Sequence, residues 1–115
     1  MSIKRMKVGA RMSQAVAYGE TVYLAGQVAD NAAEDVAGQT RQILAKIDGL
    51  LAEAGSDKSK LLSATVWLTD IRSFDAMNKI WDAWVSPGNT PARACVEAKL
   101  ARSDLLVEIG VIAAR

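Results

Sequence analysis

The last strand-like segment of the chain, 106–113, is apolar on both of its faces. Alternate side chains of an extended strand point to opposite faces. One face carries Val107, Ile109, Val111 and Ala113, and the other carries Leu106, Glu108, Gly110 and Ile112. A strand with this pattern needs cover on both faces, so we expect it to lie inside a sheet with something packed on each side.

Only two helices are available to cover that sheet. Apolar residues recur at helical spacing over 36–54, ending before Gly55, and again over 74–85, after the N-cap residue Ser73. Strand-like runs occupy 3–8, 13–18, 21–29, 61–68, 90–97 and 106–113. Two helices cover one face of five or six strands. We therefore expect the second face to be buried against another copy of the chain.

The size and charge of the chain indicate its domain number, its possible partners and its cellular location. Its 115 residues are most simply one domain, residues 1–115. The formal net charge of +1 gives no basic field for nucleic acid, so we expect no nucleic-acid partner. Lys4, Arg5 and Lys7 are not followed by an apolar run, which argues against a signal peptide, and no stretch is long enough to span a membrane. With a single cysteine, Cys95, these features predict a cytoplasmic protein without membrane partners.

The chain contains no histidine. This removes the commonest general base and metal ligand, and it excludes Ser-His-Asp and Cys-His catalysis. A zinc site is excluded for practical purposes as well, because only one cysteine remains. Acid–base chemistry must therefore use carboxylates, tyrosines, lysines, Cys95 or bound water.

We expect 90–97 and 106–113 to form a terminal hairpin around the polar loop 101–104. In that register Glu97 lies near Glu108. One sheet face then carries Arg93, Cys95, Glu97 and Lys99 beside Leu106, Glu108, Gly110 and Ile112. Charges inside apolar strands are costly unless they are paired or used, so this hairpin is the candidate site.

Each candidate residue has two interpretations. Arg93 suits a carboxylate or phosphate ligand through its planar fork, or it forms a salt bridge across strands or subunits. Glu108 would have a pKa raised by desolvation, as a proton donor or water-positioning group requires, or it is paired with Arg93 or Arg115. Cys95 is more often a small core residue than a nucleophile. Gly26, inside a strand-like run, indicates a bulge or the close approach of another group.

These segments resemble a known family. Thr90-Pro91-Ala92-Arg93-Ala94-Cys95-Val96-Glu97 with Leu106-Val107-Glu108-Ile109 is similar to the C-terminal motif of the RidA/YjgF family of reactive-intermediate deaminases. Four further segments match that family in the same order: 22–28, 35–42, 65–70 and 74–78. The resemblance covers nearly the whole chain.

The resemblance implies an α+β fold, a chorismate mutase-like two-layer sandwich with a mixed sheet and two helices on one face. It also implies a homotrimer with clefts between subunits. The implied activity is hydrolysis of enamine or imine intermediates, such as 2-aminoacrylate, to 2-keto acids and ammonia, with no metal or organic cofactor. Arg93 would hold the substrate carboxylate and Glu108 would handle water and protons. The backbone around Cys95 and Gly26, with Gln27 beside it, would contact substrate or water.

The chain departs from the family pattern at two positions. Met12 stands where a Gly-Pro-Tyr-Ser-type stretch supplies a tyrosine to the pocket, and Ala25 stands where a serine precedes Gly-Gln. Two hydroxyls are lost from the implied site. A second hypothesis is therefore a non-catalytic module that binds a small carboxylate such as a 2-keto acid. A third, ribonuclease activity, is disfavoured by the near-neutral charge, the absence of histidine and the lack of a clustered basic, aromatic surface.

Overall fold

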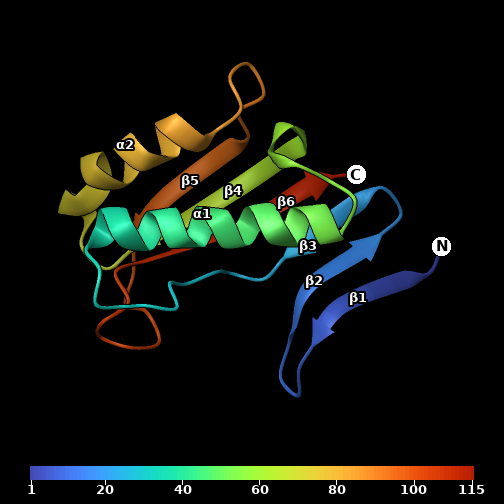
Figure 1. Ribbon diagram of the computed structural model, residues 1–115, viewed down its shortest axis with the longest axis horizontal. Helices are drawn as coiled ribbons and strands as arrows, with labels where there is room; N and C mark the ends of the chain where they lie inside the picture. The colour runs from blue at the N-terminus through green and yellow to red at the C-terminus, as the bar shows by residue number, and fades with distance from the viewer.

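Strand β6 (Val107–Ala114) lies in the middle of a six-stranded sheet in the computed structural model, which describes residues 1–115 (Figure 1). It pairs antiparallel with β3 (Thr21–Leu24) on one side and with β4 (Leu61–Leu68) on the other. Beyond β3 lie β2 (Ser13–Tyr18) and β1 (Ile3–Val8), and beyond β4 lies β5 (Ala92–Glu97), parallel to it. The order is β1-β2-β3-β6-β4-β5, so the expected mixed sheet is confirmed.

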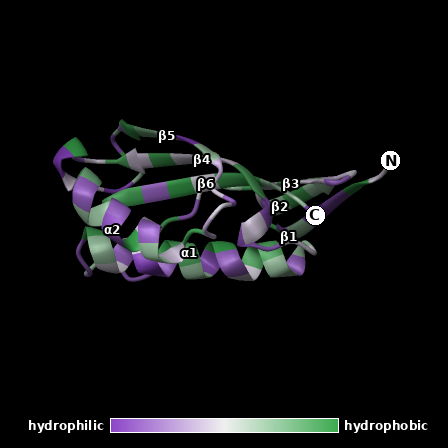
Figure 2. Ribbon diagram, turned by 90° about the horizontal axis from the view of Figure 1, so that it is seen from above, coloured by the Kyte–Doolittle hydropathy of each residue, from purple (hydrophilic) through white to green (hydrophobic).

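Both helices pack on the same face of this sheet. Figure 2 shows α1 (Val36–Glu53) and α2 (Phe74–Trp84) together on one side of strands β4, β5 and β6. Asp35 caps α1 by accepting a 2.9 Å hydrogen bond from the Gly38 backbone N–H, and Gly55 follows the helix with a left-handed φ of +80°. Short 3₁₀ turns, Lys58–Lys60 and Ile71–Ser73, precede β4 and α2. The expected two-layer α+β arrangement is confirmed.

The core lies between the helices and the inner face of the sheet. The inner side chains of β6 are fully or almost fully buried: Val107, Ile109, Val111 and Ala113. They meet buried residues of α1, α2 and β4, among them Ile43, Ile47, Leu51, Met77 and Val66. The alternation expected for 106–113 is therefore what anchors the sheet to its helices.

The other face of the sheet has no cover from the chain itself. Glu108, Gly110 and Ile112 of β6 are half-buried, in step with the paired residues of β4. Tyr23 and Val96, on the same face, are 46% and 44% exposed. Apolar side chains left open in this way are typical of a surface that receives a partner. Burial of this face by another copy remains a prediction.

The expected terminal hairpin is wrong. Strand β5 pairs only with β4, and β4 separates it from β6. The reason is the helix between β4 and β5: a strand–helix–strand unit returns its second strand parallel to the first, at the sheet edge. The segment 98–106 then carries the chain back to the centre, where a strand that is apolar on both faces is best buried. The run 21–29 is also shorter as a strand, since after Leu24 only Gln27 forms a bridge, with Ile109.

Neither helix combines the length and the apolar character that a membrane crossing requires.

Two glycines of the α1 region differ only in backbone conformation, and they make a matched pair for a stability test. A Cβ atom at Gly49, inside α1, or at Gly55, just after it, would meet no atom within 4 Å. Gly49→Ala should raise the free energy of unfolding by about 0.5–1 kcal/mol, because glycine is a poor residue for a helix interior. Gly55→Ala should lower it, because its φ of +80° is strained for alanine. Urea denaturation of both variants measures this, and equal shifts of the same sign would contradict it.

Candidate active site

Glu108 lies on the open face of the sheet, over Gly26. The alternation that buries Val107 and Ile109 under the helices turns Glu108 to the opposite side, across from Trp67 of β4. A Cβ atom at Gly26 would lie 3.0 Å from Cδ of Glu108 and still closer to its Oε2. The expected close approach at Gly26 is therefore confirmed, and the approaching group is the Glu108 carboxylate.

Gly26 and Gly110 together leave room on this face. A Cβ atom at Gly110 would lie 3.5 Å from the Trp67 ring and 3.7 Å from Cα of Gly26. The backbone of Gln27 holds the Gly26 segment against β6, through reciprocal hydrogen bonds of 2.8 and 3.1 Å with Ile109. A shallow pocket of about 250 Å³ adjoins the carboxylate; it is lined by Trp67, Ala98, Lys99, Leu100, Ala101 and Glu108.

Burial raises the pKa of Glu108 above its ordinary value of 4.5, because the apolar surroundings disfavour the charged form. No ion pair within the chain involves Glu108, so pairing with Arg93 or Arg115 is excluded for the single chain. A carboxyl group with a raised pKa on an accessible face can carry a proton to or from a reacting molecule.

Arg93 lies on the opposite face of the sheet, beneath α2. Its partner in the β4–β5 ladder is the buried Ala64, and its guanidinium carbon lies 5.0 Å from the ring centre of Trp81 and 6.0 Å from that of Phe74. These are cation–π distances. The Nη1 atom is buried and has no hydrogen-bond partner, and the same is true of Oδ1 of Asn78 on α2. The charge of Arg93 is thus held by aromatic rings and left without an acceptor.

Cys95 is the next residue of β5 on the same face as Arg93, and it packs against the hydrophobic core. Burial raises the pKa of its thiol, with the nearby charge of Arg93 acting in the opposite direction. A thiol that stays protonated near neutral pH is a weak nucleophile. The structure therefore supports the interpretation of Cys95 as a packed residue whose backbone, at an edge strand, is available to a ligand.

The remaining predicted residues lie apart from Glu108. The Gln27 side chain is 3% exposed and turns toward the helices, where its Nε2 donates to Oε1 of Gln14 and to the Ala25 carbonyl, both at 2.9 Å. Met12 is 48% exposed in the loop between β1 and β2. Among the predicted site residues, the single chain thus brings Glu108 to Gly26 on one face of the sheet and Arg93 to Cys95 on the other.

The expectation that Arg93, Cys95 and Glu108 share one sheet face is wrong. It rested on direct pairing of the two C-terminal strands. Residues that pair across two strands share a sheet face. Arg93 and Cys95 of β5 pair with Ala64 and Val66 of β4, which face the helices, whereas Glu108 of β6 pairs with Trp67 of β4, which faces the open side. Lys99, expected near Glu108, does line the same pocket. Phe74 and Trp81 lie in the predicted helix 74–85 and Trp67 lies in the predicted strand 61–68, and only the tertiary arrangement sets them beside the charged groups.

The whole chain matches known proteins. A family model described as Endoribonuclease L-PSP matches residues 2–115. A RutC family protein of Haemophilus ducreyi is 43% identical, over 97% of this chain and 96% of its own. The RutC family protein YoaB of Escherichia coli (strain K12) is 44% identical over 99% of both chains. The crystal structure of a YjgF family member from Neisseria meningitidis, 46% identical, aligns with a TM-score of 0.98 over 100% of this chain and 96% of that one.

The raised pKa of Glu108 predicts how a Glu108→Gln variant depends on pH. The folded protein holds this proton more tightly than the unfolded chain, so the associated stability is present below pH 4.5 and is lost as the pH rises through the folded-state pKa. Because glutamine cannot ionise, the stability of the variant relative to the parent should increase over that range and level off above it. Urea denaturation from pH 4 to 8 at one fixed protein concentration measures this. A difference that does not change with pH would contradict it.

Proposed function

The chain belongs to the Endoribonuclease L-PSP family, which includes the RutC and YjgF proteins, and from this premise we propose that it hydrolyses imines and enamines of 2-amino acids to 2-keto acids and ammonia. The observation that carries the proposal is the Glu108 carboxyl group, held over Gly26 on an open face with a raised pKa and no ion-pair partner. Arg93, with a buried and unpartnered donor, supports it as the group that holds the substrate carboxylate.

The reaction needs few groups. The oxygen of a water molecule bonds to the imine carbon, the C=N π bond breaks, and the nitrogen takes up a proton. The resulting carbinolamine passes its hydroxyl proton to nitrogen as its C–N bond breaks, which gives the keto acid and ammonia. An enamine first takes a proton at its terminal carbon to become an imine. In the proposed mechanism Glu108 accepts the proton from the attacking water and returns it to nitrogen. Arg93 and the backbone near Cys95 and Gly26 orient the substrate.

This chemistry requires no metal and no organic cofactor, since water is the only other reactant. Gln27 contributes through its backbone, which holds Gly26 beneath Glu108. The small net charge of +1 supports a small-molecule substrate over a nucleic acid or a membrane surface, and a single free cysteine supports a cytoplasmic location.

We further propose that the complete site is shared between copies in a homotrimer. Arg93 and Glu108 of one chain lie on opposite faces of the sheet, so a site that uses both side chains takes them from two chains. The open face supports the association, because it presents Trp67, Tyr23, Val96 and Ile112 with no cover. Burial of this face against a second chain would also explain its apolar pattern.

The first test is release of keto acid from imines generated in situ by an amino-acid oxidase. The parent should accelerate release, and Arg93→Ala should lower kcat/KM by about 10- to 100-fold, the equivalent of one charge-assisted hydrogen bond. Glu108→Ala should be at least as impaired, while Cys95→Ala should keep most of the activity. No acceleration with any imine would refute the proposal.

Mixing the two inactive variants tests the shared site. When Arg93→Ala and Glu108→Ala chains are refolded together in equal amounts, random assembly should restore about a quarter of the parental sites, because each site needs one intact residue from each type of chain. Each variant refolded alone is the control. Sedimentation showing a stable monomer at micromolar concentration, or no recovery in the mixture, would exclude the shared site.

The position of the Glu108 carboxyl group can be tested separately. Gly26→Ala places a methyl group where that carboxyl group lies, so the side chain must move and activity should fall by more than about tenfold, with the fold retained. Gly49→Ala adds the same methyl group in open space and should leave activity unchanged. Equal activity of the two variants would show that the carboxyl position does not matter.

A second candidate function is favoured by Met12 and Ala25, which remove two hydroxyl groups from the family pattern. In that case the protein binds a small carboxylate such as a 2-keto acid without turning it over. Keto-acid binding that depends on Arg93, together with no turnover of any imine, would establish this function instead.

A further inference from the structure

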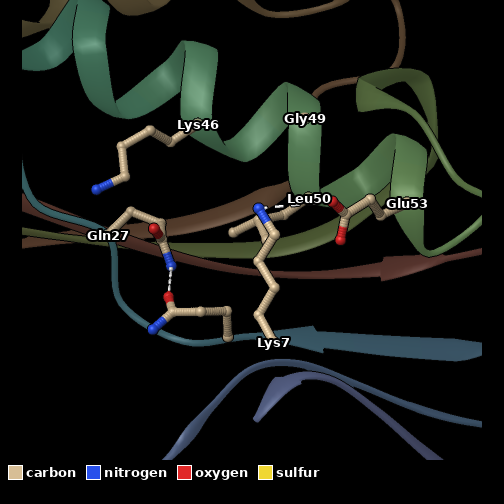
Figure 3. Close-up of a pocket in the computed structure, with 7 residues that line it drawn as sticks. Lys7, Gln27, Lys46, Gly49, Leu50 and Glu53 are labelled. Carbon is tan, nitrogen blue, oxygen red and sulfur yellow. Dashed lines mark hydrogen bonds and ion pairs between the residues drawn. The ribbon is translucent and has the colours of Figure 1, made fainter. Parts of the chain in front are cut away.

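A polar pocket lies on the helix side of the sheet, between α1 and the β1–β2 hairpin (Figure 3). Its volume is about 260 Å³, and its lining comprises Lys7, Gln14, Gln27, Lys46, Gly49, Leu50 and Glu53. This is smaller than the usual range of about 300–1,000 Å³ for pockets that hold drug-sized ligands. Any ligand of this pocket is therefore small, and five of the seven lining residues can offer it a polar or charged group.

Gly49 opens the wall of this pocket on α1. It lies in the interior of the helix, where glycine is less stable than alanine. Packing does not require it there, because a Cβ atom would meet no atom within 4 Å. The glycine thus destabilises the helix without allowing any closer packing. The space beside it is part of the pocket.

The hairpin turns two polar side chains into the same space. Met6 and Ala15 already face the core, so by strand alternation their neighbours Lys7 and Gln14 should point to the other face. Both nevertheless line the pocket. Lys7 does so with a left-handed φ of 49°, the only non-glycine residue of the chain with a positive φ. A strained backbone conformation persists only where the surrounding structure fixes it, and such conformations are common at binding sites.

The two amides are fixed relative to each other. Nε2 of the buried Gln27 donates to Gln14 and to the Ala25 carbonyl, which uses both of its protons. This leaves the Gln27 carbonyl oxygen as an acceptor and the Gln14 amide nitrogen as a donor, each without a partner in the chain. Figure 3 shows the Gln27 oxygen on the side of the pocket.

Charged groups of both signs also line the pocket. Nζ of Lys7 and Oε1 of Glu53 lie 3.5 Å apart, and both side chains are about half exposed. Nζ of Lys46 donates to the Val28 carbonyl at 2.9 Å and to Asp30 at 3.0 Å, so one of its three protons remains free. Cations and anions therefore face the same small space, next to one free amide donor and one free amide acceptor.

We infer that this pocket binds a small α-amino acid in its zwitterionic form. The carboxylate would accept from the ammonium groups of Lys7 or Lys46, and the ammonium group would donate to Glu53 or to the Gln27 oxygen. A simple anion would face Glu53 and a simple cation would face two lysines, at a cost from like charges in each case. A zwitterion satisfies both sets and separates the Lys7–Glu53 pair without leaving either charge unpaired. The site is distinct from the open face that carries Glu108, and the inference does not rest on the proposed function.

The test is an NMR titration of uniformly ¹⁵N-labelled protein with L-alanine, using propionate and ethylamine as probes that lack one charge each. All titrations use the Arg93→Ala background, so that carboxylate binding at Arg93 does not contribute. L-Alanine should shift the Gly49 amide and the side-chain amides of Gln14 and Gln27 with a Kd of about millimolar. Propionate and ethylamine should bind at least about tenfold more weakly. Equal binding of propionate and L-alanine would overturn the inference in favour of a plain anion site.

Two variants separate the pocket from the rest of the surface. Gly49→Leu fills the space and should weaken L-alanine binding at least about tenfold, whereas Ala52→Leu, an exposed position of the same helix outside the pocket, should leave it unchanged. Glu53→Gln should remove the preference for L-alanine over propionate. Shifts that persist in Gly49→Leu, or no shift with L-alanine at all, would refute the site.

Discussion

The structure depends on how β6 is covered. This strand joins the two halves of the sheet, β1-β2-β3 on one side and β4-β5 on the other, through antiparallel ladders along both of its edges. One row of its side chains is buried under α1 and α2, and this burial provides the core. The other row has no cover within the chain. The same alternation that stabilises the fold therefore leaves Glu108 on an apolar, open face, where its pKa is raised.

The candidate site follows from this one-sided cover. Glu108 and Gly26 meet on the open face because the Gln27–Ile109 bridge holds the segment after β3 against β6. Arg93 belongs to the helix side, where Trp81 and Phe74 hold a guanidinium that has no acceptor. Both side chains are held in place, yet neither forms an ion pair within the chain. An incomplete arrangement of this kind is what a site assembled from two chains requires; the number of chains in the assembly is part of the proposal.

The helix side carries a second set of unsatisfied polar groups. Gln27 links the two regions, since its backbone supports Gly26 beneath Glu108 and its side chain lines the pocket beside α1. The two regions differ in chemistry. The open face offers a carboxyl group among apolar neighbours, which suits proton transfer, and the pocket offers both signs of charge with free amide groups, which suits recognition of a zwitterion.

Much of the fold was determined by the sequence itself. The helical periodicity of 36–54 and 74–85 and the alternation in 106–113 are local properties, and they sufficed to predict two helices on one face and a sheet with an open side. Gly26 likewise indicated a close approach, and the motif around Arg93 and Glu108 indicated the family. The tertiary structure alone decided which strands are neighbours. Ala101–Asp104 has the composition of a hairpin loop, yet the α2 crossover sets β5 at the edge and β4 beside β6, so Arg93 and Glu108 fall on opposite faces. Strand order is set by burial and by the handedness of connections between distant segments. The sequence of a short polar loop does not determine either of them.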